Sequence, residues 1–93
     1  MLEKEIESLL SRRTKQMGGV ALKFVSPGMS GIPDRIVLLP GGHIAFVELK
    51  APGKPMRPMQ LRRKRQLEIL GFPVYRVDQP EQIGGVLDEI RGA

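Results

Sequence analysis

Apolar residues recur along the chain with two periods, one typical of helices and one typical of strands. A stripe at three- and four-residue spacing predicts a helix over residues 2–17, which the glycine pair at 18–19 ends. Similar stripes predict helices over residues 58–70 and 81–91. Short branched and apolar runs predict strands over residues 20–25, 35–39, 44–49 and 72–77.

This order of elements indicates an α/β fold. The first three strands are close enough in sequence to form a meander, and the last can cross over behind the second helix to join them. The result is a mixed four-stranded sheet flanked by helices, with a further helix at the C-terminus. With 93 residues, we expect a single domain over residues 1–93 with a thin core.

The second and third strands form a hairpin whose register the sequence specifies. Pro-Gly-Gly at residues 40–42 predicts a tight loop. A loop centred on Gly41 sets apolar residues opposite apolar residues along both strands, for example Ile36 opposite Phe46. A shift by one residue would turn every side chain to the other face.

In that register Asp34 lies opposite Glu48, so both carboxylates project to one face about 5 Å apart. Lys50, two residues further on, projects to the same face. Opposed carboxylates repel each other unless a cation lies between them, and oxygen ligands favour magnesium. The lysine could then orient or deprotonate a water, or stabilise negative charge on a phosphate. The alternative is an aspartate in a turn and a solvated Glu–Lys pair.

Two further side chains are candidates for this site. Glu3 lies nearest the apolar stripe of the first helix and could join the acids, with Glu5 and Glu7 as alternatives. All three could instead simply favour the helix start as anions. Gln60 shares a stripe with Arg63, Leu67 and Leu70 and is expected on the inward face, where it could hold a ligand or a water. The alternative for Gln60 is a surface amide.

Charge and composition narrow the class of partner. The net charge of +5 and the pI near 10.1 favour an anionic partner. Cysteine is absent, which excludes disulfides and zinc–thiolate sites, and the single His43 excludes a histidine-rich metal nuclease. The N-terminus is charged and no apolar run has spanning length. We therefore expect a soluble, intracellular, cytoplasmic protein that does not associate with membranes.

A dense basic block in the second helix suits contacts with backbone phosphates, although a solvated helix face is the alternative. The small residues of the 26–31 loop could approach a phosphate closely, or could be an ordinary connector. The expected DNA-binding residues are Lys23, Ser26, Arg35, Lys54, Arg57, Arg62 and Arg63.

Together these motifs carry a resemblance to a known family. Gly-Ile-Pro-Asp at 31–34, Glu-Leu-Lys at 48–50 and the downstream Gln60 resemble the PD-(D/E)XK nuclease superfamily. Within it the chain is similar to the VRR-NUC domain, in the stand-alone form of phages and bacteria. The resemblance extends from Glu3 to about Val77 and implies a restriction-endonuclease-like αβββαβ core. One departure is Arg57, which stands where relatives often carry a capping serine or threonine.

The resemblance implies a magnesium- or manganese-dependent DNA endonuclease. Metal ligands would be Asp34, Glu48, the main-chain carbonyl of Leu49 and Glu3. Lys50 would be the catalytic lysine and Gln60 the motif glutamine. The implied activity is that of a homodimeric Holliday-junction resolvase. The alternatives are a flap or duplex DNA nuclease with the same site, and a non-catalytic basic nucleic-acid-binding module.

Overall fold

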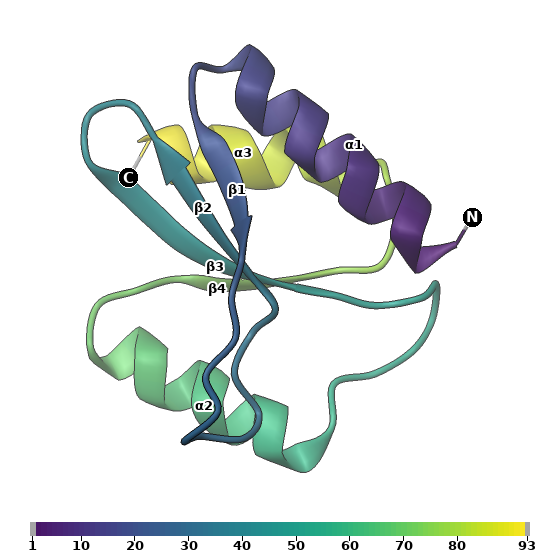
Figure 1. Ribbon diagram of the computed structural model, residues 1–93, viewed down its shortest axis with the longest axis vertical. Coiled ribbons are helices and arrows are strands. Elements are labelled where there is room, and N and C mark those ends of the chain that lie inside the picture. The colour runs from purple at the N-terminus through teal and green to yellow at the C-terminus, as the bar shows by residue number, and fades with distance from the viewer. Residues whose placement is uncertain (1, 93) are drawn as a thin grey trace.

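Three helices surround one four-stranded sheet in the computed structural model, which describes residues 2–92 (Figure 1). This confirms the expected α/β class and the order of elements. Within residues 2–92 no helix has the length and apolar character needed to cross a membrane. The elements are α1 (Glu3–Gln16), β1 (Val20–Lys23), β2 (Arg35–Leu39), β3 (His43–Leu49), α2 (Pro58–Ile69), β4 (Val74–Val77) and α3 (Gln82–Gly92).

The strands lie in the sheet in their sequence order, β1-β2-β3-β4. The first three pair antiparallel, and β4 pairs parallel with β3 after the crossover through α2. The predicted hairpin register is confirmed, because Ile36 pairs with Phe46 and Leu38 with Ile44. Gly41 and Gly42 both have positive φ angles, 92° and 82°, which residues other than glycine rarely adopt.

The two faces of the sheet are covered differently. Helices α1 and α3 lie on one side of the sheet and α2 lies on the other (Figure 1). Strand side chains facing α1 and α3, such as Val37, Ala45 and Val47, are fully buried. Because strand side chains alternate, Ile36, Phe46 and Glu48 face the α2 side. The core is built from Ile6, Leu10, Val37, Leu39, Ala45, Val47, Leu49, Val77, Ile83, Leu87 and Ile90.

Several element boundaries differ from the expected ones by a residue, and the larger differences concern two strand ends and one face of α2. The first strand ends at Lys23 rather than residue 25, and the fourth begins at Val74 because it follows Pro73. In α2 the expected inward stripe is wrong for Leu70, which is 65% exposed, since the helix ends at Ile69 and the chain turns away. Gln60 is the one α2 residue that is buried.

Candidate active site

Asp34 is held at the entrance to β2 by its main chain. Pro33 before it is fully buried and fixes the approach of the chain. The Asp34 carbonyl oxygen accepts hydrogen bonds from the Phe24 amide (2.8 Å) and from Arg35 Nη1 (2.7 Å). Its carboxylate Oδ1 accepts a 3.2 Å bond from the Leu49 amide of β3. The last bond ties Asp34 to the strand that carries Glu48.

Glu48 is buried, and its two carboxylate oxygens have different surroundings. Oε2 accepts a 2.9 Å hydrogen bond from Gln60 Nε2 and lies 3.5 Å from Lys50 Nζ. Oε1 is buried and has no hydrogen-bond partner within residues 2–92. A buried, unpaired carboxylate oxygen is costly. The arrangement therefore lacks one positively charged or hydrogen-bonding group at Oε1.

Burial weakens the acidity of both carboxyl groups. Burial first, and the charge of Glu48 second, raise the pKa of Asp34 from 3.8 to about 6, although the Leu49 amide lowers it. Burial also raises the pKa of Glu48, and the charge of Lys50 partly offsets that rise. A divalent cation between the two groups would neutralise both. The donor set, two carboxylates with one free buried oxygen, fits a hard oxygen-preferring ion such as Mg²⁺.

Gln60 has a fixed orientation because both ends of its amide are engaged. Its Oε1 accepts a 2.8 Å hydrogen bond from the Arg57 amide, three residues earlier, and so caps the start of α2. Its Nε2 therefore faces Glu48. Position 57, where the resemblance expects a capping serine or threonine, makes no side-chain cap here, and Gln60 satisfies the Arg57 amide from within the helix instead.

The early glutamates lie apart from this pair. Glu5 accepts a 2.9 Å bond from the Leu2 amide at the start of α1, and Glu7 pairs with Arg35 at 2.5 Å. Glu3 is exposed. Its charge raises the pKa values of Asp34 and Glu48, but it is the smallest of the causes that act on each of them. Across residues 2–92 no three acidic, histidine or cysteine side chains gather closely enough to hold a metal ion. In the described residues the site therefore has two carboxylates, and Glu3 does not join them in a three-carboxylate cluster.

The loop before Asp34 lies directly on the start of α2. Gly31 has a φ of +77°, and a Cβ there would lie 2.6 Å from the Met59 carbonyl oxygen. Arg63 Nε donates a 2.8 Å bond to the Ser30 carbonyl oxygen. A cavity of about 380 Å³ lies between this loop and the start of α2, and Arg57 and Gln60 are among the residues that line it. The close packing of the loop on α2 thus requires a glycine at position 31. Arg63, which was expected to contact DNA, holds this loop through its bond to Ser30.

The expected DNA-binding residues divide into two groups. Arg35 is buried, and its guanidinium contacts Glu7 and the Asp34 carbonyl oxygen, so the structure does not place it among the exposed basic side chains. Ser26 is half-buried, and its carbonyl oxygen accepts a bond from the Met29 amide. Exposed basic side chains remain at Lys23, Lys54, Arg57 and Arg62.

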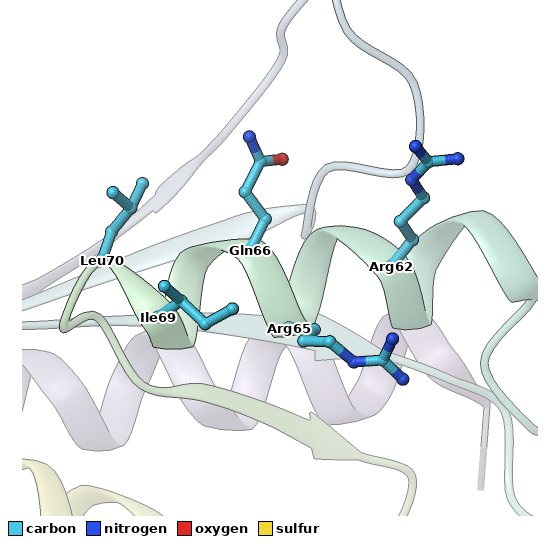
Figure 2. A pocket seen from close by; sticks show the side chains of 5 residues that line it. All are labelled: Arg62, Arg65, Gln66, Ile69 and Leu70. Carbon is cyan, nitrogen blue, oxygen red and sulfur yellow. The ribbon is translucent and has the colours of Figure 1, made fainter.

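The outer side of α2 forms a shallow basic and apolar surface. In Figure 2, Arg62, Gln66 and Leu70 project to one side of the helix, and Arg65 and Ile69 to another. This surface contains no carboxylate. It can offer cations to a phosphate backbone, but it has no group for hydrolysis.

Two residues near the site carried no prediction from the sequence. Arg76 of β4 donates to the Lys54 carbonyl oxygen, and Asp78 accepts a 2.9 Å bond from the Gly53 amide. The parallel pairing of Leu49 with Val77 sets Lys50 beside Asp78. One signal was present in the sequence: Asp78 is a charged residue at the end of a strand that was expected to cross over and join the strand carrying Glu48.

Comparison with known proteins agrees with this geometry. No family model matches the sequence. A protein of Acyrthosiphon pisum secondary endosymbiont phage 1, named "Putative nuclease p44", is 48% identical over 79 residues, which are 85% of each chain. A solved structure described as "VRR_NUC domain" superposes with a TM-score of 0.86 at 29% identity, covering 95% of this chain and 97% of the other.

Proposed function

The chain belongs to the VRR-NUC family of nucleases, and on that premise we propose that it is a magnesium- or manganese-dependent endodeoxyribonuclease. We further propose that it cuts branched DNA, a four-way junction in particular, as a homodimer. The observation that carries the metal-dependent chemistry is Glu48, buried beside Asp34 with one oxygen held and the other free.

Asp34, Glu48 and the main-chain carbonyl of Leu49 would hold the cation. A divalent ion there supplies Lewis-acid stabilisation of negative charge on the phosphate. The two carboxylates are held by hydrogen bonds from Leu49 and Gln60, so they need little rearrangement on binding. Preorganised ligands of this kind lower the cost of binding.

Lys50, directly after β3, and Gln60, in the first turn of α2, both lie beside the carboxylate of Glu48. Lys50 is 7% exposed and stays beside Glu48, where its ammonium group can orient the attacking water or stabilise charge that develops on the phosphate. Water attacks phosphorus in line, and the bond from phosphorus to the leaving oxygen breaks. One product keeps the phosphate and the other gains a hydroxyl.

An apolar patch supports the homodimer. Val20, Leu22 and Ile44 are 43%, 45% and 41% exposed, and they lie on the α2 side of the sheet near the hairpin turn. Grouped exposed apolar side chains are typical of protein–protein contacts. A two-fold dimer brings two sites to a four-way junction, which has matching two-fold symmetry.

The direct test is magnesium-dependent cleavage of a labelled four-way junction beside linear duplex of the same sequence. Wild type, Lys50→Ala and Lys15→Ala are compared, since Lys15 is an exposed lysine at the far end of α1. We expect paired cuts in the junction with wild type and Lys15→Ala, and none with Lys50→Ala. DNA binding should persist in all three.

Other outcomes select other functions. Cleavage of both substrates would keep the nuclease and remove the junction preference, and cleavage of a flap alone would favour flap processing. DNA binding that is indifferent to magnesium, without cleavage by wild type in magnesium or manganese, would favour a non-catalytic binding module.

A further inference from the structure

The end of β4 lies beside the connection from β3 to α2, and two side chains there bind that connection. Residues 50–57 contain no helix or strand. Asp78 Oδ2 accepts a 2.9 Å hydrogen bond from the Gly53 amide. Arg76 donates to the carbonyl oxygen of Lys54 through Nε at 3.1 Å and through Nη2 as well. The connection is therefore bound at two successive residues.

The two side chains that bind the connection are themselves ordered. Arg76 Nη2 lies 3.1 Å from Asp78 Oδ2, and the side chain of Asp78 is 11% exposed. Gln82, at the start of α3, accepts a 2.8 Å bond from the Asp78 amide and fixes its main chain. The hydrogen bond from Gly53 lowers the pKa of Asp78, so its carboxylate stays charged at neutral pH.

The connection matters because the site lies at both of its ends. Lys50 begins it, and its amide donates a 2.9 Å bond to the Val77 carbonyl oxygen of β4. Gln60, in the first turn of α2, follows it and donates to Glu48. The chain between them has a single local turn, from the Lys54 amide to the Ala51 carbonyl oxygen. Without a brace, that stretch would let the first turn of α2 move relative to Glu48.

We propose that Asp78 and Arg76 are positioning residues, which hold the β3–α2 connection so that Lys50 and Gln60 meet at Glu48. Neither side chain bonds to Asp34, Glu48 or Lys50 in the described part of the chain, so both act through the main chain of Gly53 and Lys54. The consequence for cleavage rests on the nuclease function proposed above, whereas the placement of Gln60 can be measured without it.

The kinetic test is single-turnover cleavage by Asp78→Ala at saturating magnesium and DNA. We expect the rate to fall roughly tenfold, because small displacements of catalytic groups have effects of this size or larger. DNA affinity, measured in calcium, should stay within about twofold of wild type, since no phosphate contact is removed. Asp78→Asn keeps an oxygen for the Gly53 amide and should recover part of the rate.

Asp88→Ala is the matched control. It also removes an aspartate paired with an arginine, Arg91 at 2.8 Å, but on the exposed surface of α3 away from the connection. Its rate and affinity should equal those of wild type. Equal losses of rate and affinity in Asp78→Ala, or an unchanged rate, would overturn the proposal.

A second readout is independent of activity. In the NMR spectrum of the metal-free protein, Asp78→Ala should shift the side-chain amide signals of Gln60 and speed hydrogen exchange at Gly53, while core amides such as Val47 keep their protection. Unchanged Gln60 signals would overturn the proposal even in an active enzyme. If wild type cuts no DNA, the nuclease function fails, and shifted Gln60 signals would still support the brace.

Discussion

Gln60 joins two contacts that are usually made by separate residues. Its oxygen caps α2 through the Arg57 amide, and its nitrogen holds one oxygen of Glu48. One amide group therefore couples the position of the helix to the position of the Glu48 carboxylate.

Gln60→Leu should affect both stability and catalysis. Loss of the cap and an unpaired buried Glu48 should lower the free energy of unfolding by about 2 kcal/mol. Cleavage should fall at least about tenfold because Glu48 loses its fixed orientation. Urea unfolding and single-turnover rates measure the two effects, with Gln66→Leu on the outer side of α2 as the control. Full activity in Gln60→Leu would contradict this role.

The raised pKa of Asp34 gives the metal-free protein a characteristic pH dependence. A carboxyl group with a pKa of 3.8 when unfolded and about 6 when folded favours the fold fully below pH 3.8. That contribution is lost as the pH rises through about 6. Asp34→Asn keeps an oxygen for the Leu49 amide and carries no charge. It should therefore stabilise the metal-free protein at pH 7.5, by about 1 kcal/mol, while abolishing cleavage.

Thermal unfolding of wild type and Asp34→Asn between pH 4.5 and 7.5, with chelator present, checks this prediction. The melting temperature of the variant should exceed that of wild type at pH 7.5, and the gap should narrow toward pH 5. Added magnesium should raise the wild-type value at high pH and leave the variant unchanged. A gap that does not vary with pH would exclude the ionisation of Asp34 as its cause.

At the scale of elements, the 26–31 loop packs directly on the start of α2. Gly31→Ala would introduce strain from its φ of +77° and a contact of 2.6 Å with the Met59 main chain. We expect a loss of about 2–4 kcal/mol in the free energy of unfolding. Gly28→Ala in the same loop meets nothing within 4 Å and should be nearly neutral. Equal effects in denaturant unfolding would show that the loop is not packed on α2.

The hairpin could be predicted from the sequence because two independent patterns agree there. The Pro-Gly-Gly turn and the matching apolar positions set the register of β2 and β3, and that register brings Asp34 and Glu48 together. Contacts between elements that are distant in the sequence have no such pattern of residues that would predict them. The burial of Arg35 against Glu7 depends on how α1 packs on the sheet, which helix periodicity alone does not determine.

The bonds from β4 to the β3–α2 connection show the same limit. In the sequence, nothing distinguishes Arg76 from an ordinary strand residue or Asp78 from an ordinary turn residue. Their partners are the main-chain atoms of Gly53 and Lys54, and a main-chain partner has no residue type to signal it. Gln60 was predicted on the inward face from its helix stripe, whereas its bond to the Arg57 amide was not.

At the scale of the whole molecule, the apolar patch near the hairpin turn predicts self-association. Ile44→Glu should convert a dimer to a monomer, because a carboxylate would be buried without a partner at the contact. Ile69→Glu is the control, since Ile69 is more exposed but lies on the outer side of α2. Sedimentation velocity over a range of concentrations distinguishes them. A wild-type monomer at high concentration would contradict the dimer.

The order of strands in the sheet also has a consequence for folding kinetics. β1, β2 and β3 pair with their neighbours in sequence, whereas β4 reaches β3 only after the crossover through α2. Local pairings form faster because less chain must be closed into a loop. Asp34 and Glu48 should therefore meet early, before Gln60 arrives, and their repulsion should slow the remaining steps. We expect stopped-flow refolding to be faster in magnesium than in chelator, and Asp34→Asn to remove that difference.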